Sequence, residues 1–90
     1  MAEFLIEHPT SAESWEEVRP RLEAALRKNL DPGLLREQWQ QETLRLIGFG
    51  VDAVIELEDG KLRARAALGP PASLFRAKIE SAIRAALAGL

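Results

Sequence analysis

Apolar and polar residues alternate along two adjoining segments of the chain, between residues 51 and 68. The first segment reads VDAVIELE and the second KLRARAAL, with Asp59-Gly60 between them. Alternation with a period of two is typical of a β-strand that is buried on one face. Asp-Gly favours a two-residue turn, because such a turn needs positive φ at both positions. The pattern therefore predicts a β-hairpin.

A two-residue turn also determines which residues lie opposite each other in the hairpin. Lys61 and Arg63 then face carboxylates, whereas Arg65 faces Val54. Opposite charges across a strand pair stabilise it by a few tenths to about 1 kcal/mol, so the pattern favours a solvated face that neutralises its own charge. A phosphate site and a partner-binding face are the alternatives. The predicted pairs are Glu58 with Lys61, Leu57 with Leu62, Glu56 with Arg63, and Ile55 with Ala64.

The N-terminal segment EFLIEHP alternates in the same way and ends at a proline. Phe4 and Ile6 fall on one side of the predicted strand, and Leu5 and Glu7 fall on the other. Proline cannot donate a backbone hydrogen bond to a neighbouring strand. We therefore expect a short strand that ends at Pro9 and lies at the edge of a sheet or is paired on one side only.

The next segment has the period of an amphipathic helix. Ser14 and Glu17 match a capping box, in which each side chain accepts a hydrogen bond from the first turn. Pro20 conflicts with a regular helix, because it removes one backbone hydrogen bond at a cost of about 3 kcal/mol. We expect a helix that is kinked near Pro20, or alternatively one that begins later, and that ends at residues 31–33. The predicted apolar face consists of Trp15, Val18, Leu22, Ala25, Leu26 and Leu30.

Residues 34–50 are less regular. Apolar residues alternate with polar ones up to Trp39 and again at Leu44 and Leu46, which favours two strands joined by a tight turn. A helix over residues 34–46 is the alternative, because Gln, Glu, Arg and Leu favour helices. The Gly48-Phe49-Gly50 segment predicts a bulge or a sharp change of chain direction.

A second amphipathic helix follows Gly69-Pro70-Pro71, which ends the hairpin. Ser73 is the expected cap, and a start one turn earlier at Pro71 is the alternative. A basic amphipathic helix can lie on a lipid-like surface, but its apolar face more often covers a sheet. The apolar stripe consists of Phe75, Ile79, Ala82, Ile83, Ala86, Leu87 and Leu90, and the opposite face carries Arg76, Lys78, Glu80 and Arg84.

Together these elements predict one α+β domain over residues 1–90, in the order β-α-β-β-β-β-α. A single antiparallel sheet is expected to carry both helices on one face, as a miniature of the helix-grip arrangement, in which a sheet wraps a long C-terminal helix. Alanines on that face let a helix approach closely and leave little room for a large cavity. The covered face is predicted to be lined by Ile55, Leu57, Leu62, Ala64, Ala66 and Leu68.

Composition narrows the class of protein. The net charge is −2, whereas nucleic-acid binders usually carry a basic surplus, so we expect no nucleic-acid partner. The absence of cysteine excludes disulfides and zinc sites built from cysteine. Glu3 and Glu7 stand where a signal peptide would need positive charge, and no segment reaches the roughly 18 apolar residues of a membrane span. We expect a cytoplasmic protein with no integral membrane segment.

Few residues suggest chemistry. His8 is the only histidine in the sequence and has no cysteine to join it, so we expect an ordinary surface or interface residue. Asp52 and Glu56 share a strand face, but at about 3.3 Å per residue they lie about 13 Å apart, which is too far for a retaining carboxylate pair. We expect no catalytic, cofactor-binding or metal-binding residue, and therefore no enzyme.

Four residues are candidates for contact with a surface or a partner, namely Ile47, Phe49, Val54 and Arg65. Leu90 is a further apolar candidate, and Phe49 alternatively belongs to the core beside a bulge. Trp39 is expected in the core or in a dimer interface, because a single tryptophan is a weak platform for stacking bases. A small chain without disulfides often enlarges its core by pairing with a second copy.

The stretches TLRLIGFGVDAVIELEDGKLRARAALG and LFRAKIESAIRAAL resemble the small polyhydroxyalkanoic acid system proteins. In that family a T-L strand leads to a G-V-D segment, an acidic hairpin, a strand ending in L-G, and a helix with I-E in its middle. Pro20 and Pro70-Pro71 depart from the family pattern, and residues 7–9 match its N-terminal H-x-H-x-P-H only loosely. The matching positions are Thr43, Leu44, Gly50, Val51, Asp52, Ile55, Leu68, Gly69, Phe75, Lys78, Ile79 and Glu80.

The resemblance implies a bacterial, granule-associated accessory protein of polyhydroxyalkanoate storage. Such a protein would bind a granule surface or a protein partner without catalysis, and the family supplies no catalytic residue to carry over. Two alternatives stay open. One is a small lipid or acyl carrier with a pocket between the C-terminal helix and the sheet, and the other is a homodimeric interaction module of unrelated role.

Overall fold

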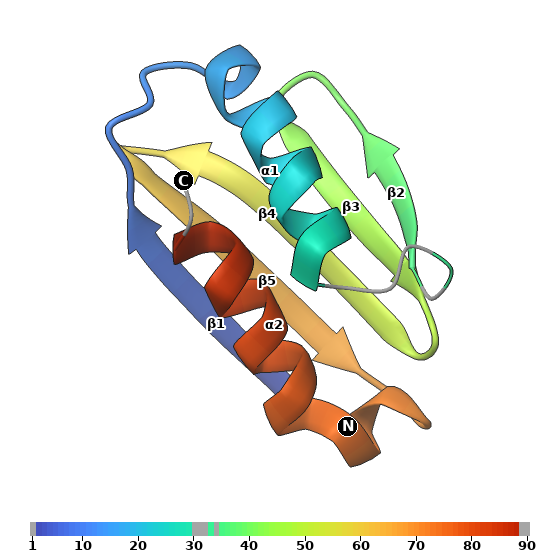
Figure 1. Cartoon of the computed structure of the whole chain (residues 1–90). Helices are drawn as coiled ribbons and strands as arrows, with labels where there is room; N and C mark the ends of the chain where they lie inside the picture. Colours follow the sequence, from blue (N-terminus) through green and yellow to red (C-terminus); the bar gives the residue numbers. More distant parts are fainter. Residues whose placement is uncertain (1, 30–32, 34, 89–90) are drawn as a thin grey trace.

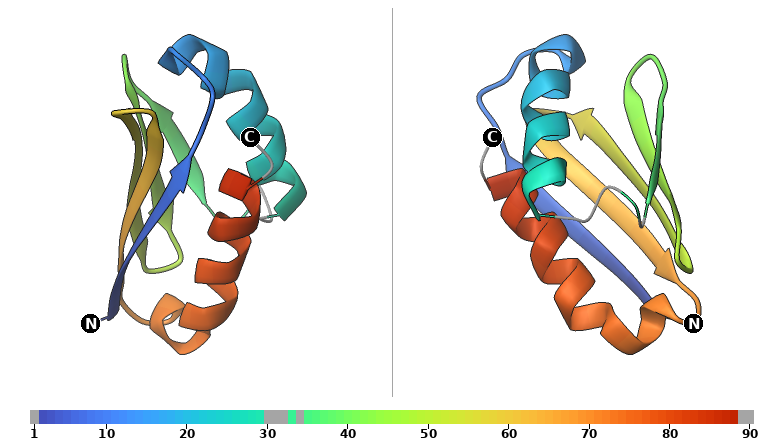
Figure 2. Two further views of the ribbon diagram at one scale, coloured as in Figure 1. Left: turned by 90° about the vertical axis from the view of Figure 1, so that its left-hand side faces the viewer. Right: turned by 45° about the vertical axis from the view of Figure 1, so that its right-hand side comes forward.

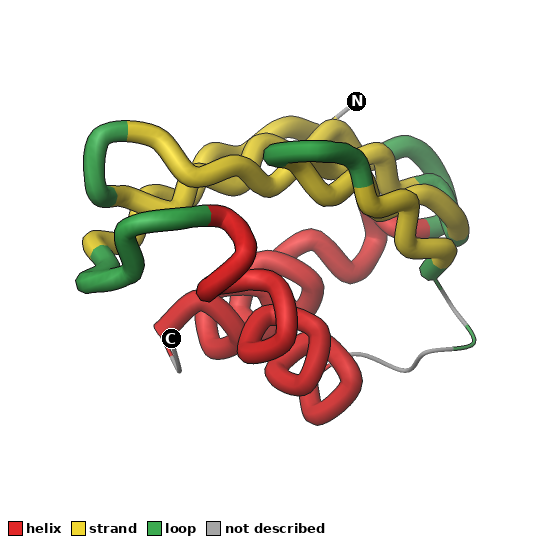
Figure 3. Tube along the Cα trace, turned by 90° about the horizontal axis from the view of Figure 1, so that it is seen from above, coloured by secondary structure: helices red, strands yellow, loops and turns green. Residues whose placement is uncertain are grey.

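The computed structural model describes residues 2–29, 33 and 35–88. These residues form one antiparallel sheet and two helices, and both helices lie on the same face of the sheet (Figures 1 and 3). The predicted α+β class and element order are therefore confirmed. The elements are β1 (Ala2–Pro9), α1 (Trp15–Asn29), β2 (Arg36–Trp39), β3 (Thr43–Gly48), β4 (Val51–Glu58), β5 (Lys61–Leu68), the 3₁₀ turn η1 (Ala72–Phe75) and α2 (Arg76–Ala88).

The β4–β5 hairpin has the predicted turn and register. Asp59 and Gly60 both have positive φ, 51° and 73°, as a two-residue turn of this kind requires. Glu58 lies opposite Lys61, and each of the other predicted pairs is also present. The inner and outer faces of the two strands follow from this register.

The sheet order is β1-β5-β4-β3-β2, so the N-terminal strand pairs with the second strand of the hairpin. β1 lies at one edge, as predicted, with Phe4 and Ile6 buried. The other edge is β2, which confirms two strands in the middle of the chain rather than a helix. Both edge strands therefore pair on one side only in the part of the chain that the structure describes.

The core lies between the sheet and the two helices. α1 contributes Trp15, Val18, Leu22 and Leu26, and α2 contributes Ile83, Ala86 and Leu87. The helices pack against each other, and α2 also packs on β1 and β5, while α1 lies over the part of the sheet nearer β2 (Figure 1). The predicted covered face is buried as expected, except that Leu57 is half-buried.

Small side chains on the sheet allow this close packing. Ala53, Ala64 and Ala66 are all buried beneath the helices. A larger side chain at any of them would force the two layers apart or into strained rotamers. The two alanines between Leu62 and Leu68 on the inner face of β5 therefore let the helix layer lie close to the sheet.

Helix α1 begins where the sequence predicted. Ser14 Oγ accepts a hydrogen bond from the backbone N–H of Glu17 at 3.4 Å. The Glu17 carboxylate accepts from the N–H of Glu13 at 3.0 Å, one residue before the position that a capping box predicts. The helix continues through Pro20, so the alternative of a later start is wrong. Leu30, Asp31 and Pro32 lie outside the described residues.

The start of the C-terminal helix differs from the expectation. Ser73 is not a cap, because it lies inside η1, and Pro71 is the residue that precedes this turn. The alternative of an earlier start at Pro71 is therefore nearer to the structure. Phe75 does not join the buried stripe, since its side chain is 49% exposed. Leu90 lies outside the described residues.

The Gly48-Phe49-Gly50 segment makes the second tight turn, between β3 and β4. Gly48 pairs with Val51, so Phe49 and Gly50 are the two turn residues, with φ of 56° and 86°. The backbone N–H of Gly69 donates to the carbonyl oxygen of Gly50 at 2.8 Å. This contact holds the β3–β4 turn against the chain that leads into η1.

Gly50→Ala should destabilise the fold more than Gly60→Ala. Both positions have positive φ, which costs roughly 1–2 kcal/mol for a residue with a Cβ. At Gly50 the added Cβ would also lie 2.4 Å from the carbonyl oxygen of Gly69, whereas nothing lies within 4 Å of it at Gly60. Urea unfolding of the two variants measures the difference, and equal midpoints would contradict the close contact.

Candidate functional site

The four candidate contact residues fall on two different surfaces. Ile47, Val54 and Arg65 lie on the face of the sheet that the helices leave uncovered. Phe49 lies instead in the β3–β4 turn at one end of the molecule. The structure therefore separates the candidates into an open sheet face and an end surface.

The open sheet face mixes apolar and charged side chains. One row crosses all five strands, because each residue pairs with the next: Leu5, Arg65, Val54, Arg45 and Gln38. Leu5 is 51% exposed, and the alternation in EFLIEHP already placed it opposite Phe4 and Ile6. A shallow depression on this face is lined by Leu5, Val54, Arg65, Arg45 and Asp52 among others.

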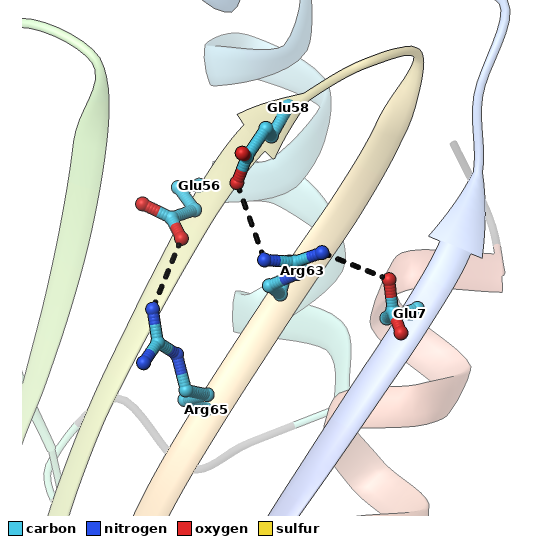
Figure 4. A network of polar contacts seen from close by, with 5 residues as sticks. All are labelled: Glu7, Glu56, Glu58, Arg63 and Arg65. Atoms are coloured by element: carbon cyan, nitrogen blue, oxygen red, sulfur yellow. Dashed lines mark hydrogen bonds and ion pairs between the residues drawn. The ribbon is translucent and has the colours of Figure 1, made fainter.

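A network of ion pairs occupies one part of this face (Figure 4). Arg63 bridges two strands, with one guanidinium nitrogen 3.3 Å from Glu7 and the other 3.3 Å from Glu58. Arg65 lies 3.5 Å from Glu56. The hydrogen bond to Glu7 and the charge of Glu58 raise the pKa of Arg63 above its usual range.

The contacts of Arg63 and Arg65 with β4 are diagonal rather than directly across. Arg63 lies opposite Glu56 in the register but pairs with Glu58, and Arg65 takes Glu56. The twist of a sheet brings diagonal neighbours within reach of long side chains. Arg65 lies opposite Val54, as predicted, and its carboxylate partner Glu56 is a diagonal neighbour.

Arg45 and Asp52 form a further pair, between β3 and β4. The Arg45 guanidinium donates two hydrogen bonds to the Asp52 carboxylate, at 3.1 Å and 3.0 Å. These hydrogen bonds hold the pKa of Asp52 below its ordinary value of 3.8. Asp52 is therefore a paired residue of the open sheet face.

The open face consequently compensates most of its own charge. Each arginine on β3 and β5 has a carboxylate partner, and these partners come from β1 and β4. Exposed pairs of this kind contribute little to stability, typically below 1 kcal/mol each. They do pair all three arginines of β3 and β5 with carboxylates, which supports the prediction of a solvated face that neutralises its own charge.

The end surface is apolar. Leu74, Phe75 and Phe49 are 79%, 49% and 40% exposed, and we call these three residues the apolar end. The rings of Phe49 and Phe75 stack with their centroids 6.2 Å apart. The hydrogen bond from Gly69 to Gly50 holds the two segments together. The apolar end is thus assembled from residues about 25 positions apart in the sequence.

Sequence reasoning missed two members of the apolar end. The helical stripe placed Phe75 in the core by extending a period of 3.6 residues back from Ile79. Residues 72–75 form a 3₁₀ turn instead, and its period of 3.0 residues rotates Phe75 away from the stripe. Pro70-Pro71 just before this turn was the available signal that the helix does not start regularly.

The tryptophans belong to the covered side of the sheet. Trp39 is half-buried and packs on Trp15, with centroids 6.0 Å apart. Arg19 lies 4.9 Å above the Trp39 ring, and the indole N–H of Trp39 donates to Glu37 at 3.1 Å. Trp39 was predicted in the core or in a dimer interface, and it packs against the edge of the core while remaining partly exposed. The buried indole nitrogen of Trp15 has no hydrogen-bond partner.

No metal centre is formed by the residues that the structure describes, because they contain no cluster of three His, Cys, Asp or Glu side chains. His8 is half-buried, and its Nδ1 lies 2.9 Å from the carbonyl oxygen of Pro9. Three of the surface depressions lined by described residues include no residue of α2. Neither described helix combines the length and the apolar character needed to cross a bilayer.

The sequence matches a known protein family over most of its length. The model of the family "Putative polyhydroxyalkanoic acid system protein" matches residues 6–90. The chain belongs to this family. No curated protein and no solved structure matches the chain. The resemblance that the sequence motifs indicated is confirmed.

The motif residues of this polyhydroxyalkanoic acid system protein have structural roles. Gly50 ends the β3–β4 turn, Val51 and Asp52 begin β4, and Gly69 directly follows Leu68 at the end of β5. Two of these segments touch through the hydrogen bond between Gly69 and Gly50. The motifs that carried the resemblance thus specify the second tight turn and its contact with the chain before η1.

Arg45→Gln should raise the pKa of Asp52 towards its ordinary value, because it removes the charged donor. A carboxylate with a lowered pKa in the folded state stabilises the fold above its unfolded pKa, and this contribution is lost as pH falls through the folded pKa. In the unaltered protein the pair is therefore expected to weaken below about pH 4. Carbon-detected NMR titration of Asp52 measures the change.

Arg65→Gln is the matched control for this titration. It removes a cation from the same face but leaves the Arg45–Asp52 contact in place. An Asp52 titration that is unchanged by Arg45→Gln, or shifted equally by both variants, would contradict the assignment.

Proposed function

We propose that this polyhydroxyalkanoic acid system protein binds the surface of a storage granule through the apolar end and carries out no chemistry of its own. The observation that supports this most directly is the grouping of exposed apolar side chains. Among the described residues, five large apolar side chains are exposed, and Phe49, Leu74 and Phe75 lie together at one end. Exposed apolar groups that cluster in this way mark interaction surfaces.

The size of the apolar end suits weak and reversible binding. Complete burial of a leucine or phenylalanine contributes roughly 1.5–3 kcal/mol. Scaled by the exposed fractions of these three side chains, burial would contribute roughly 4 kcal/mol, which corresponds to a dissociation constant in the millimolar range. A protein held by this surface alone would exchange between the granule and solution.

The open sheet face is a weaker candidate for the same role. Leu5 and Val54 are exposed there, but ion pairs surround them and would lose hydration on burial. The alternatives of an acyl carrier and of a homodimeric module stay predictions. Native mass spectrometry for bound acyl species and light scattering for mass test them.

Phe49→Asp and Leu74→Asp should each reduce co-sedimentation of the protein with purified polyhydroxyalkanoate granules. A charge at either position must be desolvated when the apolar end is buried, so we expect at least a tenfold weakening, and the double variant should abolish binding. Aspartate tolerates the positive φ of Phe49, so this change adds little backbone strain.

Leu5→Asp is the matched control, because Leu5 is exposed to a similar extent but lies on the open sheet face. It should leave co-sedimentation unchanged, and circular dichroism should show the three single variants and the double variant folded. Equal loss of binding in Leu5→Asp, or full binding by the double variant, would overturn the proposal.

A further inference from the structure

We infer that the apolar end and the exposed face of η1 and α2 together bind the interface of an anionic lipid layer. The inference rests on the proposed function, since both use Phe49, Leu74 and Phe75. It adds the chemistry that is recognised beside the apolar end, namely negatively charged lipid headgroups.

The charge of the chain is distributed unevenly. Residues 72–88 contain Arg76, Lys78 and Arg84 and a single carboxylate, Glu80, so they carry a net charge of +2. The whole chain carries −2, which leaves −4 on the remaining residues. The helix next to the apolar end is therefore a basic element on an acidic protein.

The exposed face of this helix lacks carboxylates. All five residues from 74 to 78 are exposed, and further along α2 so are Ser81, Arg84, Ala85 and Ala88. Glu80 is half-buried and lies 3.6 Å from Arg76 and 3.7 Å from Arg84. Lys78 has no ion-pair partner within the described chain. Glu80 thus compensates part of the charge of Arg76 and Arg84, and the exposed surface of the helix keeps a net positive charge.

The geometry presents this surface at an extremity of the molecule. In Figures 1 and 2, η1 and the first turn of α2 extend beyond the start of β1. A guanidinium nitrogen of Arg76 donates to the carbonyl oxygen of Glu3 at 3.3 Å, which ties this first turn to the sheet. The apolar end can therefore meet a flat surface without the sheet being in the way.

An anionic lipid layer could bind both the exposed apolar side chains and the cations beside them. Exposed leucine and phenylalanine enter the boundary between headgroups and acyl chains, while neighbouring cations remain at the level of the phosphates. The small side chains of Ala77, Ser81 and Ala85 let the helix lie close to such a surface. Each lysine or arginine near an anionic membrane strengthens binding roughly fivefold, so the cations add to an apolar contact that is weak alone.

Other occupants fit less well. A second copy of the same face would bring net positive charge against net positive charge, which disfavours a symmetric dimer here. A nucleic acid would use the cations but leave Leu74 and Phe75 without apolar partners. An uncharged surface would use the apolar end but not the cations.

The test uses the full chain and flotation with two kinds of vesicle, phosphatidylcholine alone and an equal mixture of phosphatidylcholine with phosphatidylglycerol. We expect at least tenfold stronger binding to the mixed vesicles, which falls as salt is raised because surface charges are screened. Lys78→Gln/Arg84→Gln should weaken binding to mixed vesicles roughly 25-fold. Leu74→Ser should weaken binding to both kinds.

The matched control is Arg21→Gln/Lys28→Gln, which removes two exposed cations from α1. It should bind mixed vesicles like the unaltered protein. Equal loss in both double variants would overturn the inference, since only net charge would then matter. Equal binding to both kinds of vesicle, or stronger binding to a double-stranded oligonucleotide than to mixed vesicles, would also overturn it.

The outcome is separable from that of the proposed function. Suppose that Phe49→Asp abolishes co-sedimentation with granules, that Lys78→Gln/Arg84→Gln does not change it, and that the protein binds no vesicles. These results would overturn the lipid inference but would leave the granule proposal in place. Vesicle binding without granule binding would support the lipid inference and overturn the granule proposal.

Discussion

The register of the β4–β5 hairpin is the constraint on which the rest of the structure depends. β5 lies inside the sheet and pairs with both β1 and β4, and β4 pairs in turn with β3. The Asp59-Gly60 turn sets the register of β4 and β5, and strand pairing then determines which side chains of the other strands face the helices. A shift of one residue would turn Arg63 and Arg65 towards the helices and expose the leucines and alanines of β5, which would remove the core.

The second tight turn connects the fold to the proposed binding surface. Positive φ at Phe49 and Gly50 reverses the chain between β3 and β4, and the missing side chain of Gly50 lets the backbone of Gly69 approach. This approach brings Phe75 against Phe49. A contact between two backbone segments, rather than any apolar pattern, thus creates the apolar end.

Cations on two surfaces of this protein differ in their surroundings. On the open sheet face, carboxylates from neighbouring strands lie within reach of every arginine on β3 and β5. On α2, the carboxylate of Glu80 is shared by two arginines, and Lys78 stands apart. The same residue types therefore neutralise one surface and leave another positive, because strand pairing supplies partners that a solitary exposed helix face lacks.

The amino-acid sequence by itself determined most of the local elements, the hairpin register and the family. These follow from short-range rules, since a period of two, an Asp-Gly turn and a capping serine act over a few residues. The sequence also placed Val54, Ile47 and Arg65 on the open face, because faces alternate along a strand.

Only the tertiary structure decided the apolar end. Its members come from the β3–β4 turn and from η1, which are distant in the chain. Residues 72–75 form a 3₁₀ turn rather than an α-helix, so the α-helical period that had placed Phe75 in the core does not apply to it. Periodicity carries no information about such contacts, because they depend on how two backbone segments meet at Gly50 and Gly69.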